Sequence, residues 1–532
     1  MNARIAYISS IFFLFVFFAG STTVLAQDEH KAGLVESHAA VSKTAATQSE
    51  SITGAKVACQ QGFADIYPCQ TADLMARISV FNLAGGLSDA AAIATNDIWG
   101  WSDPNSDREF ALVGTIGGTS FVEITDAENP VVVGFLETHT PAQVWRDIKV
   151  YENHAFIVAD AAGAHGMQVF DLTQLTTAQA PVLFEETAHY SGINSAHNIV
   201  INEETGFAYL VGGSGGGQTC GGGLHIVNIQ DPVDPQFVGC SNTGYTHDAQ
   251  CVVYNGPDTA HQGREICVES SVKDVVITDV TDKDNTFIIG TGTYPQVEYV
   301  HQGWFTEDHR YFFQNDELDE GRRGNNTKTI VWDMIDLDDP VVLDEYLALT
   351  EVIDHNLYIK GDYMYQSNYF AGLRIIDVSD PNNLVEVAYF DTVPGSNATS
   401  FGDGSWSNYP FFESGTIAVS SQQGGLFLVQ SSAVETSVDE FELPNQLTLT
   451  SAYPNPFDEQ TTFTLTVDKP QRAQVVAYDM LGRQVAVLFD GQIQPDAPQT
   501  ISFEAPELPN GKYIVRATGE TATKSQVVTL IR

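Results

Sequence analysis

The sequence predicts an all-β protein, in which a seven-bladed β-propeller is followed by a small C-terminal immunoglobulin-like β-sandwich. Two observations predict this fold. From about residue 73 to 435, short β-branched and aromatic runs alternate with turns rich in Gly, Asp, Asn and Pro, without a long amphipathic helix. A strand–turn–strand unit recurs through the same region, and a shorter stretch of alternating strands follows it.

The first 26 residues are expected to be a cleaved signal peptide. One early charge, Arg4, precedes an apolar run at 11–20 and a small-residue stretch that ends at Ala26. A membrane anchor is the alternative, but this run is shorter than the ~20 residues that span a bilayer, so the mature chain is expected to have no transmembrane segment. Residues 27–57 lack apolar periodicity and are expected to be a disordered linker.

The repeated unit occurs seven times, and residues 58–435 are assigned to the propeller on this basis. Its copies are 118–138, 165–187, 222–240, 273–292, 328–346, 371–390 and 424–430. Equivalent upstream positions, 50 to 54 residues apart, hold Asp97, Asp147, His197, His247, His301, His355 and Trp406. A period near 50 with about four strands is typical of propeller blades, although a β-sandwich or a β-solenoid is the alternative.

The seventh unit lacks a fourth strand after residues 426–432. Residues 74–83, at the start of the domain, have the composition of a strand and are expected to complete that blade. This exchange would close the ring and leave no open sheet edge.

The last 90 residues, 443–532, are expected to be a separate β-sandwich because apolar and polar residues alternate between turns. The motifs YPNPF (453–457), YDMLGR (478–483) and LPNGKYIVR (508–516) resemble the type IX secretion C-terminal sorting domain. The resemblance implies the type IX secretion machinery as a partner and an extracellular or outer-surface location. It also implies that the tail is removed or exchanged for a surface anchor.

The central region resembles the choice-of-anchor B family, whose LVIVD-type repeats form a propeller. The motifs that carry the resemblance are CQQGFADIYPC (59–69), WGWSDPNSDREFALVG (99–114), HGMQVFDL (165–172) and GYTHDAQCVVYNGPD (244–258). The resemblance covers roughly 59–435 and implies no agreed biochemical activity, so function has to be argued from individual residues.

Charge and cysteine content narrow the function further. Acidic residues outnumber basic ones 68 to 24, and a net charge of −44 repels phosphate backbones, so no nucleic-acid partner is expected. The charge is also explained by solubility alone. Six cysteines in an exported chain favour disulfides, and short loops suggest the pairs Cys59–Cys69, Cys220–Cys240 and Cys251–Cys267 among 15 connectivities. A zinc site is the alternative, but no close CxxC pair supports it.

The candidate metal site is a ring of side chains at the propeller axis, formed by Asp97, Asp147, His197, His247, His301 and His355. Imidazoles and carboxylates bind divalent transition metals, so a divalent metal ion in the axial channel is possible. The following residues, Asn198, Asp248, Gln302 and Asn356, could orient the rings. Alternatively, each repeated histidine only bonds the backbone of a neighbouring blade.

Three further features carry weaker signals. A possible calcium loop contains Asp316, Glu317, Asp319 and Glu320, although a solvated acidic loop is the simpler interpretation. The pattern GxSxG around Ser214 lacks the following helix of a nucleophile elbow and is interpreted as a flexible loop. The aromatic residues that could stack on a sugar or peptide, or only pack the blades, are Trp99, Trp101, Trp145, Trp304, Trp406 and Tyr369.

The sequence therefore favours an exported or cell-surface β-propeller that binds a ligand, a metal or a surface partner and is not an enzyme. One alternative is a metal-dependent hydrolase that uses a metal-bound water at the axial His/Asp cluster. Another is a purely structural surface protein. No catalytic residue can be singled out, and the small ligand or surface partner is not identified.

Overall fold

The computed structural model describes residues 50–88, 94–241, 243–434, 447–450, 452–467, 470–479, 483–495, 497–506, 508–519 and 523–532. The chain divides into two compact units, unit 1 (Met1–Thr436) and unit 2 (Ser437–Arg532). The described residues are almost entirely strands and turns, which confirms the all-β class. None of their helices is long and apolar enough to cross a membrane. The predicted signal peptide lies outside the described residues.

Within its described residues, unit 1 contains seven sheets of at least four strands. The first three sheets are β4 (Thr95–Ser102), β5 (Glu109–Thr115), β6 (Gly118–Glu123) and β7 (Val131–Glu137), joined by β11 (Val182–Phe184); β8 (Arg146–Tyr151), β9 (His154–Ala159), β10 (Met167–Asp171) and β12 (Ala188–Tyr190); and β14 (Asn198–Asn202), β15 (Phe207–Val211), β17 (His225–Asn228) and β18 (Gln236–Cys240). A separate two-stranded sheet pairs β13 (Ile193–Ser195) with β16 (Ser214–Gly217).

The next three sheets continue in sequence order. They are β19 (Asp248–Val253), β20 (Glu265–Ser270), β21 (Val275–Asp279) and β22 (Phe287–Gly292); β23 (Val300–Phe305), β24 (Tyr311–Asp316), β25 (Lys328–Asp333) and β26 (Val341–Leu347); and β27 (Leu357–Lys360), β28 (Tyr363–Asn368), β29 (Gly372–Asp377) and β30 (Val385–Phe390), extended by β2 (Tyr67–Gln70) and β1 (Phe63–Ala64). The short helix α2 (Asp319–Arg323) lies between β24 and β25.

The seventh sheet combines both ends of unit 1. It contains β31 (Ser405–Tyr409), β32 (Ile417–Ser421), β33 (Gly425–Ser431) and the early strand β3 (Ala72–Ile78). β3 pairs antiparallel with β33, as Ala72 faces Ser431 and Ile78 faces Leu426. The predicted strand at 74–83 ends earlier because a 3-10 turn, Val80–Asn82, follows it.

Residues 50–57 belong to this end of unit 1, although the sequence assigned them to the linker. The amide of Ile52 donates to the carbonyl of Arg77 at 2.8 Å, and the amide of Val57 donates to the carbonyl of Leu74 at 2.7 Å. This segment therefore covers part of β3. The remainder of the predicted linker, up to residue 49, lies outside the described residues.

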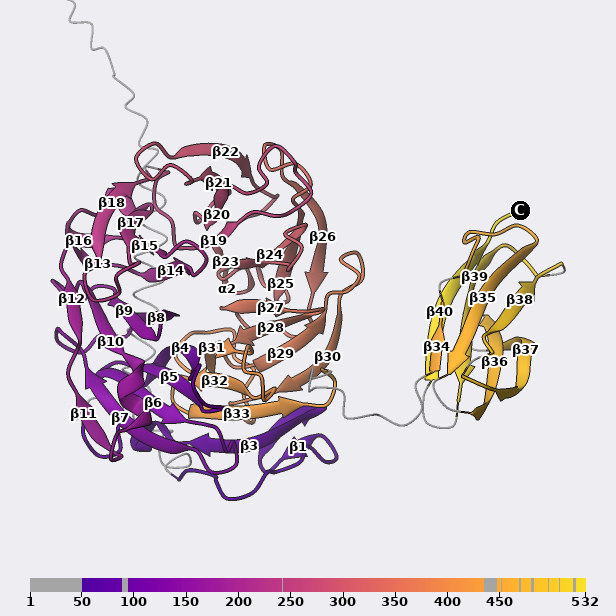
Figure 1. The fold of residues 1–532 in the computed structure, drawn as a ribbon, viewed down its shortest axis with the longest axis horizontal. Coiled ribbons are helices and arrows are strands. Elements are labelled where there is room, and N and C mark those ends of the chain that lie inside the picture. Colours follow the sequence, from indigo (N-terminus) through magenta and orange to yellow (C-terminus); the bar gives the residue numbers. More distant parts are fainter. Residues whose placement is uncertain are drawn as a thin grey trace, which may run out of the picture. The chain divides into compact units, whose positions relative to one another are not determined.

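The first strands of the seven sheets lie side by side. β4, β8, β14, β19, β23, β27 and β31 are neighbours in that order, and β31 is in turn a neighbour of β4. Figure 1 shows the sheets spread around the middle of unit 1 in the order of the sequence, from purple to orange. Residues that are about 50 positions apart in the sequence therefore meet along these first strands.

Disulfides and buried polar contacts hold neighbouring segments of unit 1. The bonds join Cys59 to Cys69, Cys220 to Cys240 and Cys251 to Cys267, so the expected disulfides are present.

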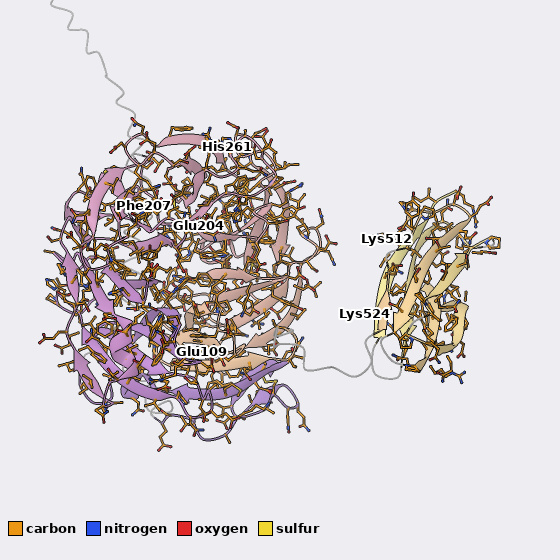
Figure 2. The ribbon with its side chains drawn as sticks, viewed as in Figure 1. Glu109, Glu204, Phe207, His261, Lys512 and Lys524 are labelled. Carbon is orange, nitrogen blue, oxygen red and sulfur yellow. A yellow bond between two sulfur atoms is a disulfide. The ribbon has the colours of Figure 1, made fainter. Side chains whose placement is uncertain are left out.

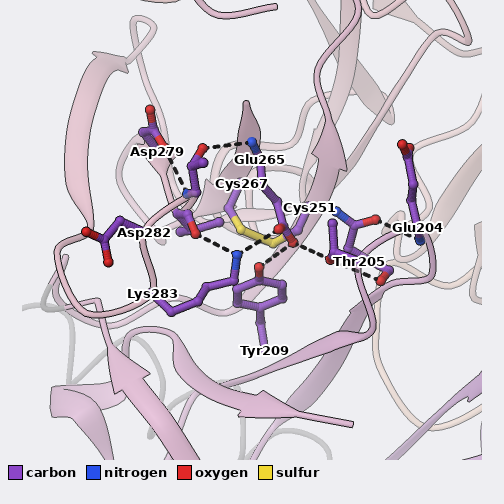
Figure 3. Close-up of polar contacts among 12 residues, drawn as sticks. Glu204, Thr205, Tyr209, Cys251, Glu265, Cys267, Asp279, Asp282 and Lys283 are labelled. Atoms are coloured by element: carbon purple, nitrogen blue, oxygen red, sulfur yellow. Dashed lines mark hydrogen bonds and ion pairs between the residues drawn. A yellow bond between two sulfur atoms is a disulfide. The ribbon is translucent and has the colours of Figure 1, made fainter. Parts of the chain in front are cut away.

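A buried carboxylate connects the third sheet to the fourth (Figure 3). On β20, Glu265 accepts hydrogen bonds from the hydroxyls of Tyr209 at 2.5 Å and Thr205 at 2.9 Å. Its other oxygen lies 2.7 Å from the ammonium of Lys283. Glu265 is therefore tied to the preceding sheet and to the turn that follows β21.

Unit 2 consists of two antiparallel sheets. They contain β34 (Leu447–Leu449), β35 (Gln460–Val467) and β38 (Gln499–Glu504), and β37 (Gln484–Ile493), β36 (Gln471–Asp479), β39 (Gly511–Thr518) and β40 (Thr523–Leu530). Phe463 and Phe503 of the first sheet share a buried core with Val475 and Val515 of the second. The two sheets therefore pack face to face.

Candidate functional site

The four predicted ring histidines lie against one another in an arc. Ring centroids are 4.4 Å apart for His197 and His247, 4.3 Å for His247 and His301, and 4.5 Å for His301 and His355. The arc ends on Trp406, whose ring centroid lies 4.6 Å from that of His355. All four imidazoles are buried. The sequence period thus brings these four histidines together.

Two of these histidines bond the backbone of the next sheet, as the alternative interpretation expects. The Nδ1 atom of His247 lies 2.9 Å from the carbonyl oxygen of His301, and that of His355 lies 2.6 Å from the carbonyl oxygen of Trp406. Since a carbonyl oxygen only accepts, both Nδ1 atoms carry the proton. His197 differs, because its Nδ1 lies 2.9 Å from the Asp160 carboxylate.

Asp97 and Asp147 do not join the histidine arc. In each, one carboxylate oxygen accepts a hydrogen bond from the next amide, and Asp248 makes the same contact. Asp248 follows His247, so the two aspartates occupy the position one residue after the histidines. The histidine position itself is taken by Asn96 and Arg146 in the first two sheets.

The aspartates surround one buried lysine. The ammonium of Lys149 lies 2.6 Å from Asp147 and 4.5 Å from the ring centroid of Trp99. Burial and the neighbouring Asp147 carboxylate raise the pKa of Asp97 to about 7. Burial also raises the pKa of Asp248 well above its usual value. Burial lowers the pKa of Lys149, but the carboxylates outweigh it and the net shift is upward.

The largest cavity described for unit 1 opens next to this group and has a volume of about 480 Å³. The residue three positions after the histidine position lines it in all seven sheets: Trp99, Lys149, Val200, Gln250, Trp304, Tyr358 and Tyr409. This agreement supports the one-residue correction for the first two sheets. Phe411 adds a further ring, and the exposed Glu203 and Glu204 connect the lining to the surface (Figure 2 labels Glu204).

The aromatic residues proposed from the sequence separate into different places. Trp99 and Trp304 line the 480 Å³ cavity. Trp145, Trp406 and Tyr369 pack in a cluster at the histidine end of the first strands. Trp101 packs on Phe110, with ring centroids 5.2 Å apart. The sequence did not single out Tyr358, Tyr409 or Phe411, although the three-residue offset from the repeat could have identified the two tyrosines.

The acidic segment at 315–320 is buried, so the solvated-loop interpretation was wrong. Asp316, Glu317 and Asp319 are fully buried and Glu320 is 2% exposed. Asp316 accepts hydrogen bonds from the amides of Glu298 and Tyr299 at 2.8 and 2.6 Å.

The remaining carboxylates of this segment have different surroundings. Asp319 lies 2.8 Å from the ammonium of Lys328. Burial raises the pKa of Glu320 well above its usual value, and the same holds for the neighbouring Asp354. A calcium ion at this segment stays a prediction.

Glu317 points from this segment toward the histidine arc. Its carboxylate oxygens lie 3.6 Å from Nε2 of His301 and 3.7 Å from Nε2 of His355. The hydroxyl of Tyr369 donates to the same carboxylate at 2.9 Å. The sequence placed Glu317 in a different site, because its distance from His301 along the chain gives no sign that the loop returns to the axis.

The GxSxG segment does not form a nucleophilic site. Ser214 lies on β16, which pairs with β13, so this part of the loop is a strand. Its hydroxyl donates to Asp160 at 3.1 Å, and the same carboxylate contacts His197 at 2.9 Å. Serine and histidine therefore both contact the aspartate instead of each other, which is not the arrangement of a catalytic triad.

Family models match two parts of the chain. Residues 451–530 match the secretion system C-terminal sorting domain, and residues 355–392 match the LVIVD repeat. The tail directs export by type IX secretion to the cell surface or the extracellular space, and it engages that secretion system. The disulfides fit a protein outside the cytoplasm. Among curated proteins, no match was found.

Two solved structures show distant similarity. One is PorZ of Porphyromonas gingivalis, described as an essential bacterial surface component of the type-IX secretion system, with a TM-score of 0.42 and 13% identity over 82% of this chain. The aligned part spans 59% of PorZ. The other is a Lactobacillus plantarum protein, with a TM-score of 0.41, 11% identity, and coverage of 77% of this chain and 100% of the other.

Proposed function

We propose that this exported surface protein is a small-ligand-binding seven-bladed β-propeller whose binding site is the 480 Å³ cavity. The seven sheets would be the blades, since their first strands are neighbours in an unbroken cycle and β3 completes the last sheet. Unit 2 would be an immunoglobulin-like sandwich, and the LVIVD match at 355–392 supports a place in the choice-of-anchor B family.

The observation that carries the binding proposal is the lining of the cavity. A volume of about 480 Å³ is in the range of small-molecule sites, which combine apolar walls with a few polar groups. Here, the rings of Trp99, Trp304, Tyr358, Tyr409 and Phe411 form much of the wall. Asp248, Gln302, Asn202 and Asn255 supply hydrogen-bonding groups of both kinds.

Charge points to a neutral ligand. Asp97, Asp147 and Asp248 repel an anion, because only Lys149 among the groups facing them is positive. An organic cation would have to stack where the Lys149 ammonium already lies, 4.5 Å from the Trp99 centroid. A neutral, hydroxyl-rich molecule such as a sugar can stack on the rings and pair with the amides and carboxylates. A neutral carbohydrate is therefore the ligand class we propose.

The proposal can be tested by titrating the full chain with neutral oligosaccharides while following tryptophan fluorescence, since two tryptophans line the cavity. Trp304→Ala should weaken binding at least about tenfold, as base- or sugar-sized rings stacked on an aromatic contribute on the order of 1.4 kcal/mol or more. Phe287→Ala is the matched control, because that ring is 51% exposed on the outer strand β22 and outside the cavity lining.

Saturable binding that depends on Trp304 and not on Phe287 would support the proposal. Binding of amines or carboxylates in preference to neutral sugars would contradict the ligand class. The hydrolase alternative would require turnover in the same titrations, and the purely structural alternative would require that no ligand of any charge binds.

A further inference from the structure

Three buried side chains at the histidine end of unit 1 bring their donor atoms to one point. His301, Glu317 and His355 each offer one ligand atom, and these atoms all lie within 4.8 Å of one another. The two imidazoles are 1% and 4% exposed and the carboxylate is fully buried. They come from the start of β23, the segment after β24 and the residue before β27, so the fold and not local sequence assembles them.

The orientation of His355 suits a metal ligand. Its Nδ1 proton is donated to the Trp406 carbonyl, which leaves the lone pair on Nε2, the atom that faces Glu317. A backbone carbonyl on the far nitrogen is the usual partner of a metal-bound histidine. Glu317 is held in the same way, because the Tyr369 hydroxyl donates to one of its oxygens.

The distances fit a small divalent ion. Zinc bonds of about 2.0–2.2 Å to nitrogen and oxygen put neighbouring tetrahedral ligands about 3.4 Å apart. The Nε2 atoms of His301 and His355 lie 3.6 and 3.7 Å from the Glu317 oxygens. A movement of a few tenths of an ångström would therefore complete three bonds, whereas calcium prefers six to eight oxygen ligands.

Space limits what else can bind there. The cavity among the histidines, lined by Arg146, His197, His247, His301, His355 and Trp406 among others, has a volume of about 10 Å³. This is about the space of one water molecule, which can serve as a fourth ligand. A substrate would not fit in that volume, so the site lacks the open access of a catalytic zinc centre.

We propose that His301, Glu317 and His355 form a site for one divalent transition-metal ion, most suitably Zn²⁺, that fixes the acidic segment after β24 to the axis of unit 1. The site is separate from the carbohydrate cavity, because no residue of the triad lines that cavity. Its loss and the loss of sugar binding can thus be told apart.

The test uses the full chain after chelator treatment, titrated with Co²⁺ and then Zn²⁺. Co²⁺ reports its ligand geometry through its visible absorption, and Zn²⁺ should displace one equivalent of it. One equivalent of ion should bind and raise the melting temperature, since a ligand that binds only the folded state stabilises it. Glu317→Gln, which keeps the shape and the Tyr369 contact, should abolish this binding, and Tyr369→Phe should weaken it about tenfold.

The matched control is His247→Ala. That imidazole is equally buried in the same arc but is not a member of the triad, so its variant should keep the one equivalent. His139 and His189, with Glu186, form a more exposed group that could bind metal adventitiously. A His139→Ala/His189→Ala variant should therefore retain the same absorption spectrum and melting shift.

Stoichiometric binding that is lost in Glu317→Gln and kept in both controls would support the site. Binding that disappears only in the His139→Ala/His189→Ala variant would overturn it, as would a wild-type chain with no metal-dependent melting shift. The wild-type measurement needs no substitution, so the outcome is decisive even if a triad variant fails to fold.

Discussion

The carboxylate of Glu109 accepts two hydrogen bonds from Ser414, a residue 305 positions later in the chain. The amide donates at 3.1 Å and the hydroxyl at 2.5 Å. Glu109 begins β5 in the first sheet and Ser414 precedes β32 in the last, so this contact connects the two sheets at which the cycle of first strands meets (Figure 2).

Glu109→Ala and Ser414→Ala should therefore show coupled losses of stability. Hydrogen bonds to a charged acceptor contribute about 1.5–3 kcal/mol when buried, and partial exposure of Ser414 reduces this to about 1 kcal/mol. A double-mutant cycle by urea unfolding measures the coupling free energy. Glu413→Ala, at the exposed neighbouring residue, should change the unfolding free energy by less than about 0.5 kcal/mol. Zero coupling would show that the contact does not stabilise the junction.

Lys283→Met should be strongly destabilising. The substitution leaves the Glu265 carboxylate, 5% exposed, without the ammonium that lies 2.7 Å away (Figure 3). Removing one partner of a buried ion pair costs about 3–5 kcal/mol. The same substitution at Lys56, whose pair with Asp73 is 47% and 31% exposed, should cost less than about 1 kcal/mol. Equal unfolding midpoints for the two variants would contradict the prediction.

Asp97→Asn should make stability less dependent on pH. The pKa of Asp97 is raised from 3.8 to about 7, so the folded chain keeps a proton that the unfolded chain has released between these values. The contribution of Asp97 to stability therefore falls as pH rises through this window. Relative to wild type, the Asn variant should gain stability from pH 4 to pH 8, at about 1.4 kcal/mol per pKa unit. A constant difference between the two unfolding curves would refute the shift.

A chain that lacks residues 50–88 should lose cooperative unfolding of unit 1. The deletion removes β3, exposes the edge of β33 and takes away the apolar contacts of Leu74 with Val429. Scanning calorimetry should show a broad transition or none. The control is a chain truncated after residue 434, which lacks unit 2 and should keep the sharp transition of unit 1. A sharp transition in the deleted chain would show that β3 is dispensable.

The period near 50 in the sequence predicted the strands of unit 1 and the meeting of His197, His247, His301 and His355. It did not fix the register in the first two sheets, because Asn96–Asp97 and Arg146–Asp147 each offer two adjacent polar residues for one position. Only the three-dimensional positions of Trp99 and Lys149 on the cavity wall resolve that choice.

Contacts made by the connecting segments were beyond sequence reasoning. The acidic run at 315–320 has the composition of a solvated loop, yet burial against Lys328 and the histidine arc gives it a structural place. Glu317 meets His301 and His355 through a turn whose direction no periodicity records. Similarly, β3 could be predicted as a strand, but its last residues follow the 3-10 turn at Val80–Asn82.

The pairing of β3 with β33 also sets an order of events during synthesis. Thr71, just before β3, accepts a hydrogen bond from Ser431, 360 residues later. The first-made strand therefore waits for the last-made one, and the seventh sheet cannot assemble on a growing chain until nearly all of unit 1 has been released. Such a long-range closure is a slow folding step. Since the sorting domain follows directly after β33, the chain acquires its export address at about the moment when unit 1 first becomes able to close.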